Sequence, residues 1–218
     1  MHGLRLRLEG LYFATFRKPT TTSVILTHTI PPYTTIRGLI SNALGLRRDD
    51  LRVQEWFRIG IKPVEEIETS REMAKILKLK GTGRKFQRGF PSSPLFREFI
   101  VNPVYDVFLA GEKSRIEEVY DALQNPERPL YLGASDDMAD VEVSEPVELE
   151  DVKATEVNSV VEGIHEGCVI EKVPYRFVQR GRKFSVEYKT VSVPRDGAVR
   201  LKEAVECVEF DGVRVQVV

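Results

Sequence analysis

Two stretches of this chain have apolar residues at helical spacing along a single stripe, and they restrict the fold more than any other feature. The first covers residues 33–44, and its stripe consists of Ile36, Leu39, Ile40, Ala43 and Leu44. Pro31 and Pro32 hold the chain extended before it, so a hydroxyl of Thr34 or Thr35 is predicted to cap the first free amides. Gly45 suits a left-handed C-terminal cap. A short helix of this kind must lie on another apolar surface.

The second stretch, residues 112–123, lies among segments that alternate like strands. Its stripe consists of Ile116, Val119, Tyr120 and Leu123. Strands are predicted at residues 4–13, 22–29, 51–62, 96–101, 104–109 and 139–143. Apart from the short segments at 22–29, before the first helix, and 96–101, at the end of the basic segment, the order is β, α, β, β, α, β. We predict an α+β fold that begins with a ferredoxin-like (RRM-like) domain, a four-stranded antiparallel sheet covered on one face.

Residues 70–97 interrupt this pattern with a strongly basic segment. Between Ser70 and Glu98 the carboxylates are Glu72 and Glu98, and the cations are Arg71, Lys75, Lys78, Lys80, Arg84, Lys85, Arg88 and Arg97. Residues 65–80 are expected to be helical or irregular, and glycines bracket a basic tip at 84–88. A segment with so many charges and so few apolar residues does not pack inside a core. It predicts a protruding arm or hairpin at about residues 70–97, which we call the arm.

The last third of the chain is rich in valine and alternates throughout, as expected for strands. Gly181-Arg182 and Asp211-Gly212 are predicted hairpin turns. We therefore predict two domains: a ferredoxin-like RNA-binding domain at residues 1–148 and a smaller all-β lobe at residues 149–218.

Charge is unevenly distributed although the formal net charge is only −1. The arm is basic, whereas residues 136–166 are acidic, with Lys153 as the one opposing cation. Such separation indicates one face for a polyanion and another that is solvated or meets a basic partner. The alternative is that the exposed segments carry charge for solubility alone.

The sequence lacks the residue patterns of metal sites, serine hydrolases and nucleotidases. The three histidines are not at metal-ligand spacing, the two cysteines are too few for a zinc site, and we expect no metal and no cofactor. There is no nucleophile elbow of a serine hydrolase and no phosphate loop of a nucleotidase. No apolar run is long enough to span a bilayer, and no signal segment begins the sequence, so we expect a cytoplasmic protein without membrane contact.

Nucleic-acid binding has better support than catalysis. Cations that would contact phosphates are Arg17, Lys18, Arg37, Lys78, Lys80, Arg84, Lys85 and Arg88, and rings that would stack on bases are Phe13, Phe16, Tyr33, Phe86 and Phe90. Metal-independent RNA cleavage needs only a base, an acid and a cation, and His28, Tyr33 and Lys85 have those properties. His28 and Tyr33 could instead pack at a strand end.

Three segments resemble the CRISPR-associated Cas family-five proteins of the RAMP superfamily. They are residues 8–19 (LEGLYFATFRKP), 31–40 (PPYTTIRGLI) and 129–137 (PLYLGASDD). The resemblance implies a subunit of a type I Cascade effector complex that acts in antiviral defence. It implies a ferredoxin-like fold with a thumb, capture of the 5′ repeat-derived handle of the guide crRNA, and contact with the backbone and large subunits. One branch of the family cuts precursor crRNA with tyrosine, lysine and histidine, but this chain has no Lys-His pair.

We therefore expect a non-catalytic RNA-binding scaffold. Two alternatives stay open: a metal-independent endoribonuclease that processes precursor crRNA, and a ferredoxin-like module that only binds other proteins.

Overall fold

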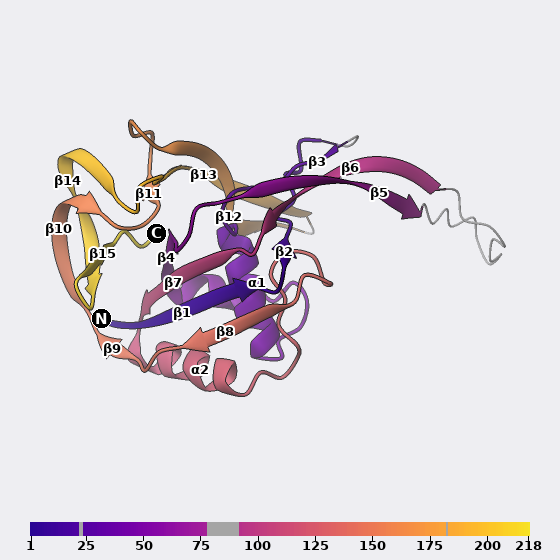
Figure 1. The fold of residues 1–218 in the computed structure, drawn as a ribbon. Coiled ribbons are helices and arrows are strands. Elements are labelled where there is room, and N and C mark those ends of the chain that lie inside the picture. The colour runs from indigo at the N-terminus through magenta and orange to yellow at the C-terminus, as the bar shows by residue number, and fades with distance from the viewer. Residues whose placement is uncertain (22–23, 78–91, 182) are drawn as a thin grey trace.

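An antiparallel sheet in the order β4-β7-β1-β8, with β9 beside β1, forms the centre of the molecule (Figure 1). The computed structural model describes residues 1–21, 24–77, 92–181 and 183–218. The strands of this sheet are β1 (His2–Gly10), β4 (Phe57–Pro63), β7 (Val104–Gly111), β8 (Ala139–Val143) and β9 (Val147–Glu148). Together with the two helices, they confirm the predicted α+β class.

Both helices cover the same face of this sheet, α1 (Tyr33–Ala43) and α2 (Lys113–Gln124) (Figure 1). Leu4, Leu6 and Leu8 point to that face and are fully buried. Their partners on β7 are Leu109, Val107 and Tyr105, so the apolar residues of neighbouring strands form one layer. The predicted stripes of both helices pack against this layer.

The two ends of α1 differ in how well the sequence predicts them. No side chain caps the N-terminus: the carbonyl of Pro32 accepts hydrogen bonds from the amides of Thr35 and Ile36, so the predicted threonine cap is wrong. The C-terminal prediction is confirmed. Gly45 has φ +65°, its amide donates to Asn42 and that of Leu46 donates to Ser41, which is a Schellman motif.

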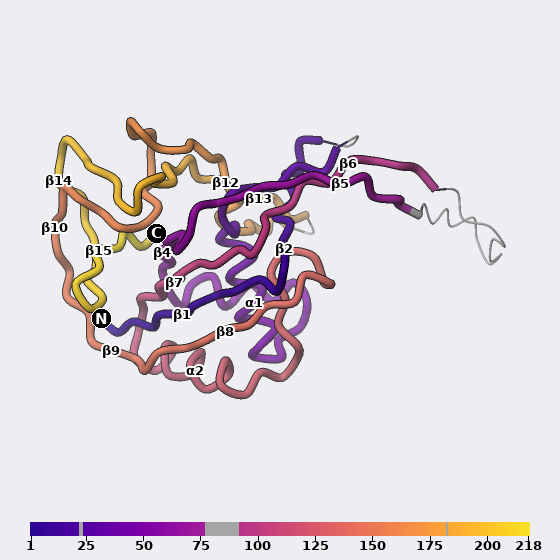
Figure 2. Tube along the Cα trace, viewed as in Figure 1, coloured from indigo at the N-terminus to yellow at the C-terminus, as the bar shows by residue number. Residues whose placement is uncertain are grey.

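A long hairpin projects from the body of the molecule (Figure 2). It consists of β5 (Thr69–Leu77) and β6 (Ser92–Val101), which pair antiparallel along their whole length. The expectation of helical or irregular structure at residues 65–80 is therefore wrong for residues 69–77, whereas residues 65–68 are irregular as predicted and residues 78–80 lie outside the described ranges. At its base β6 also pairs with β2 (Phe13–Ala14) and in parallel with β3 (Val24–Ile25). Of the described residues in the strand predicted at 22–29, which are 24–29, Val24 and Ile25 are the two that form a strand.

The strand predicted from residue 51 begins later, at Phe57. Before it lies a 3-10 helix, η1 (Arg52–Glu55), which buries Val53. The alternation of apolar residues before Phe57 therefore reflects the buried side chain of Val53 in a turn of helix, and not a pleated strand.

The remaining strands form two three-stranded sheets, which confirms the predicted β character of the last third. One has the order β10-β14-β15 and the other β11-β13-β12. Their bounds are β10 (Glu150–Val157), β11 (Val161–Glu162), β12 (Val169–Arg180), β13 (Lys183–Val193), β14 (Val199–Phe210) and β15 (Val213–Val215). Asp211 and Gly212 have positive φ, as expected of the predicted hairpin turn.

These later strands pack on both faces of the central sheet. Val173 on β12 and Val191 on β13 belong to the same buried cluster as the leucines of β1. On the opposite face, Val215 and Phe210 pack with Phe108. The division into domains at residues 148 and 149 stays a prediction. Neither helix in the described ranges is long and apolar enough to span a membrane.

Candidate nucleic-acid interface

A groove of about 420 Å³ lies where the first loop, the start of α1 and the loop before β8 meet. We call it the loop groove. Segments far apart in the sequence line it: Thr15, Phe16, Arg17, Ile25, Pro32, Thr34, Thr35, Arg97, Gly133, Ala134 and Pro174. All three segments that carry the family resemblance contribute to it.

Arg17 reaches the groove because residues 16–18 pair with residues 26–28. The amide of Lys18 donates to Leu26 and that of His28 donates to Phe16, each at 2.8 Å. This extended pairing turns alternate side chains in opposite directions. Phe16 is therefore buried in the core, which corrects its prediction as a stacking ring, whereas Arg17 is exposed.

The N-terminus of α1 forms a second side of the groove. Pro32 has extended backbone angles, φ −54° and ψ 148°, and the first turn contains no acidic residue. The first amides of a helix have no intrahelical acceptor, and the helix dipole places partial positive charge there. This side of the groove therefore favours an anion.

The loop before β8 closes the groove through glycine and a buried carboxylate. Gly133 has φ +109°, and a Cβ there would lie 2.6 Å from the carbonyl oxygen of Thr15. Asp137 Oδ2 accepts hydrogen bonds from the amides of Thr15, at 2.9 Å, and Ala134, at 3.3 Å. Burial raises the pKa of Asp137, and these two bonds oppose that rise. Asp137 thus fixes the loop against the strand that leads to Arg17.

Arg97 comes from the base of the hairpin arm. Its guanidinium lies 5.0 Å from the centre of the Phe13 ring, and its Nε lies 3.2 Å from a carboxylate oxygen of Glu72. Sequence reasoning counted Arg97 among the arm cations but did not include it in the site. The sequence contained one signal for the position of Arg97. It alternates with Phe96 along β6, so the two side chains must point to opposite faces of the strand.

These parts together suit a chain of phosphates. Two arginines, a helix N-terminus and a glycine backbone converge without a nucleophile among them, which is an arrangement for binding anions. Within the ranges that the structure describes, no group of His, Cys, Asp or Glu is placed to hold a metal ion.

His28 and Tyr33 do not reach this surface. Their side chains are buried, with residue exposures of 3% and 2%. His28 Nδ1 lies 2.9 Å from Glu171 Oε2, and burial raises the pKa of Tyr33 far above its ordinary value. A group that contacts a 2′-hydroxyl must be accessible, so this burial corrects the placement of both residues at an RNA surface. Lys85, their predicted partner, lies outside the described residues.

Arg37 also differs from its prediction. It is only 5% exposed, donates a hydrogen bond to the carbonyl of Tyr175 and stacks over that ring at 4.9 Å. Burial lowers the pKa of Arg37, and contact with Tyr175 opposes that. The residue joins α1 to β12, because position 37 lies on the helix face that β12 crosses. Its observed contacts are therefore with β12, and its role in RNA binding stays a prediction.

The other predicted cations have mixed outcomes. Lys18 is partly exposed and forms an ion pair with Glu171 at 3.2 Å, so it contributes a charge that is already paired. The predicted arm residues lie outside the part of the chain that the structure describes: Lys78, Lys80, Arg84, Lys85, Phe86, Arg88 and Phe90.

Solved structures with a similar fold come from CRISPR systems. One described as a CRISPR RNA-guided surveillance complex has 18% identity and a TM-score of 0.61, over 89% of this chain and 92% of that one. A CRISPR protein from Archaeoglobus fulgidus has 12% identity and a TM-score of 0.58, over 99% and 98%. A chain of the Type III-B Cmr-beta complex bound to cognate target RNA has 9% identity and a TM-score of 0.53, over 90% and 86%.

A search of curated proteins finds no significant match. The family described as CRISPR-associated protein (Cas_Cas5) matches residues 3–199, which is most of the sequence and includes every element that lines the loop groove. The chain therefore belongs to the Cas5 family of CRISPR-associated proteins.

Proposed function

We propose that this chain is a non-catalytic subunit of a type I CRISPR effector complex that binds the 5′ repeat-derived handle of the guide crRNA. The observation that carries the proposal is the loop groove, in which Arg17, Arg97 and the α1 N-terminus converge. Family membership supports a role in CRISPR defence, and two structures of similar fold are described as RNA-guided or RNA-bound assemblies.

The sheet order supports the ferredoxin-like arrangement as part of this proposal. Strands β1, β4, β7 and β8 with two helices on one face have the order expected of a βαββαβ unit. In this arrangement the arm and the loop groove lie at one end of the sheet, so the backbone and large subunits would meet the protein beside its RNA.

Removal of the Arg17 charge tests the proposal directly. Arg17→Ala should weaken binding of the repeat RNA from the locus that encodes this chain, and should reduce the salt slope by roughly 0.7, the value for one single-strand phosphate contact. Fluorescence anisotropy across a salt series measures both. Arg195→Ala, an exposed arginine outside the groove, is the matched control. If Arg17→Ala and Arg195→Ala changed the affinity and the salt slope equally, that result would contradict the proposal.

Cleavage is the second candidate function and has its own test. Purified protein is incubated with the same RNA in EDTA, and products are resolved on a gel. We expect no product because His28 and Tyr33 are buried. Product formation that His28→Ala abolishes would establish the endoribonuclease instead. Protein that binds no RNA at all would favour the protein-interaction module.

A further inference from the structure

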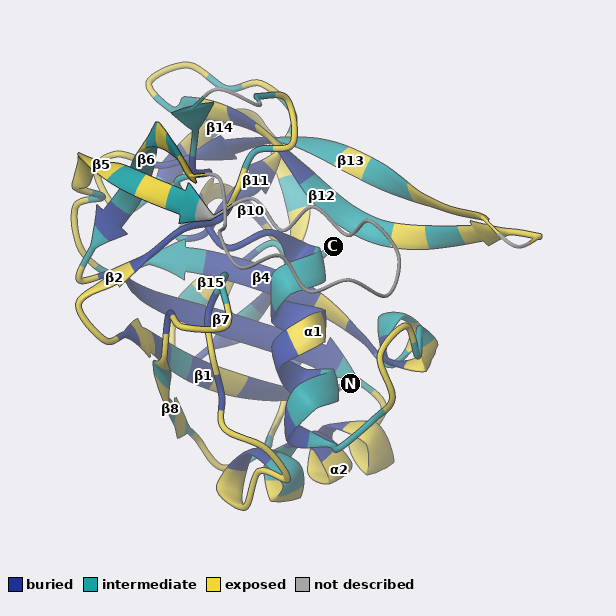
Figure 3. Cartoon of the chain, turned by 90° about the vertical axis from the view of Figure 1, so that its right-hand side faces the viewer, coloured by how far each residue is buried: buried dark blue, intermediate teal, exposed yellow. Residues whose placement is uncertain are grey.

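A second and larger groove runs along α1, with a volume of about 620 Å³. We call it the helix groove. One side is formed by α1 and the segment that follows it, and the other by Phe177 and Phe184 of the β12–β13 hairpin. Figure 3 shows the exposed stretch in the middle of α1 and the projecting β12–β13 hairpin. Thr34 lines both this groove and the loop groove, so the two are neighbours across the first turn of α1.

Gly38 forms the floor of the helix groove. Packing within the protein does not explain why this position is a glycine. It lies in the middle of α1, is exposed, and an added Cβ would meet no atom within 4 Å. Glycine inside a helix is unfavourable relative to alanine, and here no neighbouring side chain requires its small size. An external molecule that approaches the helix backbone at this point would require it.

Aromatic rings form the wall opposite Gly38. Phe177 and Phe184 are 38% and 48% exposed, although both are large and apolar. Phe184 pairs with Gln179, which is two residues from Phe177, so both rings lie on the same face of the hairpin. The side chain of Gln54 fixes this wall, because it accepts from the Phe177 amide at 2.7 Å and donates to the Phe177 carbonyl at 3.1 Å.

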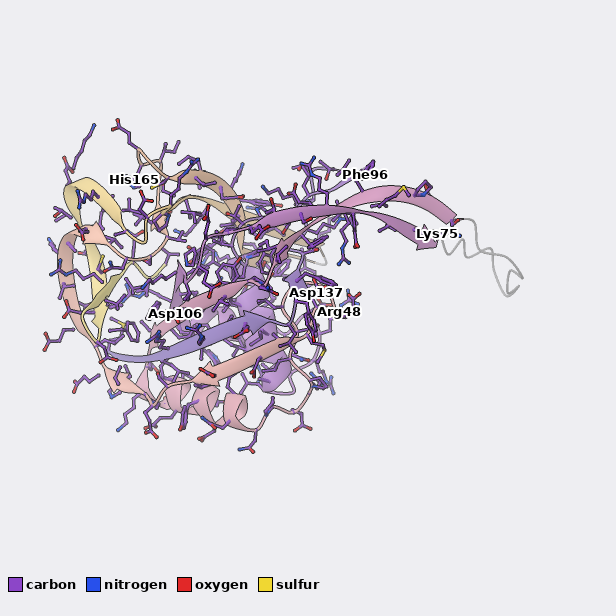
Figure 4. All side chains as sticks on the ribbon, in the orientation of Figure 1. Arg48, Lys75, Phe96, Asp106, Asp137 and His165 are labelled. Atoms are coloured by element: carbon purple, nitrogen blue, oxygen red, sulfur yellow. The ribbon has the colours of Figure 1, made fainter. Side chains whose placement is uncertain are left out.

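The charged residues of the groove leave two arginines available. Asp50 pairs with Arg52, and Arg128 donates to the carbonyls of Leu46 and Gly45 at the end of α1. Arg47 and Arg48 are exposed, and neither forms an ion pair with another described residue. Figure 4 shows Arg48 at the edge of the body. Free cations beside exposed rings are typical of a surface that binds unpaired nucleotides.

We propose that the helix groove binds unpaired bases of the same RNA strand whose phosphates lie in the loop groove. This inference rests on the proposed function and assigns it a second subsite. Phe177 and Phe184 stack on bases, Arg47 and Arg48 contact phosphates, and Gly38 lets the strand pass close to α1.

Removal of the two rings tests the stacking surface. Base stacking on an aromatic side chain contributes enough that Phe177→Ala with Phe184→Ala should weaken RNA binding about five-fold or more, measured by anisotropy with the repeat RNA. Tyr188→Ala is the matched control, since Tyr188 lies on the same hairpin, is 41% exposed and does not line the groove. Its affinity should stay at the wild-type value.

Substitution of Gly38 tests the helix groove without changing Phe177 or Phe184. Gly38→Leu should weaken RNA binding at least as strongly as the double phenylalanine variant, whereas Gly38→Ala should bind more tightly than Gly38→Leu while retaining the fold. Circular dichroism melts of both variants separate blockage of the groove from loss of structure, and we expect both variants to fold because an added Cβ at this position meets no atom within 4 Å.

Crosslinking distinguishes failure of this subsite from failure of the proposed function. The repeat RNA is prepared with single 4-thiouridines and irradiated with wild-type protein. Crosslinks to peptides around residues 177–184, as well as around Arg17, would support the inference. Crosslinks near Arg17 alone, with wild-type affinity in the double phenylalanine and Gly38→Leu variants, would overturn it and leave the proposed function intact. Protein that binds no RNA would overturn both.

Discussion

Glu171 is the residue on which the first loop and β12 depend for their contact. It is almost fully buried and accepts from Lys18 Nζ and the Thr29 amide, each at 3.2 Å, while His28 Nδ1 lies 2.9 Å away. Burial alone raises the pKa of Glu171, but the His28 hydrogen bond and the Lys18 charge outweigh it, so that pKa lies below its ordinary value. The carboxylate is therefore more stable in the folded protein than in the unfolded chain.

Glu171→Gln should lower the free energy of unfolding by about 3 kcal/mol near neutral pH, because it removes one partner of a buried ion pair. The lowered pKa means that the contribution of Glu171 is complete above the ordinary glutamate pKa of about 4.3 and is lost as the pH falls through the folded-state value. The difference between wild type and variant should therefore shrink below about pH 4. Urea denaturation at several pH values measures it.

The control for this prediction is Glu187→Gln. Glu187 pairs with Arg176 at 2.7 Å, but both side chains are exposed. Exposed pairs of this kind contribute about 0–1 kcal/mol. If both variants lost the same stability, the contact around Glu171 would be no more than a surface ion pair.

At the scale of elements, the arm is a two-stranded ribbon held by cross-strand pairs. Glu72 pairs with Arg97 on one face and Arg71 with Glu98 on the other. Met73 lies opposite Phe96, and both are exposed. Figure 4 shows Lys75 and Phe96 on the ribbon beyond the body. Isolated ribbons are only marginally stable, so a partner that covers it would supply the missing apolar contact.

The cations predicted at the arm tip have a measurable electrostatic signature. Alanine at Lys80, Arg84, Lys85 and Arg88 should reduce the salt slope of RNA binding by roughly 0.7 for each lost single-strand contact. The control replaces three exposed cations that line neither groove, Arg195, Arg200 and Lys202, and the slopes are compared per substituted residue. Figure 1 shows that β14, which contains the last two, lies far from the arm. A slope unchanged by the arm substitutions would remove the tip from the RNA site.

At the scale of the whole molecule, the later strands make the central sheet a buried layer rather than a half-exposed one. Gly60 of β4 lies close to the C-terminal segment: a Cβ there would lie 2.2 Å from Val215 Cγ1 and 3.0 Å from the Gln216 carbonyl oxygen. The backbones of β4 and the C-terminal segment also exchange hydrogen bonds between Ile59 and Val218. The first and last parts of the chain therefore stabilise each other.

Gly60→Val should destabilise the protein by about 1–3 kcal/mol or more, because overpacking forces rigid neighbours to move. Gly38→Ala is the opposite case and should stabilise it by about 0.5–1 kcal/mol, because its methyl group meets open space in a helix. Thermal melts of the two variants measure both effects. Melting of Gly60→Val at the wild-type temperature would show that the two parts are not tightly packed.

Local pattern was enough to predict much of the fold. Alternation of leucines identified β1, the apolar stripes identified both helices, and Gly45, Asp211 and Gly212 identified their turns. Each of these features depends on neighbours within a few residues, where period and backbone sterics decide the outcome. The family resemblance also came from three short segments, residues 8–19, 31–40 and 129–137, but only the fold brings these segments together at the loop groove.

Only the tertiary structure decided which candidate site residues are accessible. Arg37 is buried because Tyr175, 138 positions away, crosses α1, and His28 is buried because Glu171 approaches from the same distant strand. Conversely, Arg97 and Phe177 reach grooves through pairings that no local period encodes. The sequence by itself determined which residue types and elements exist, and long-range packing determined which of them are accessible at the surface, because burial depends on what lies opposite in space.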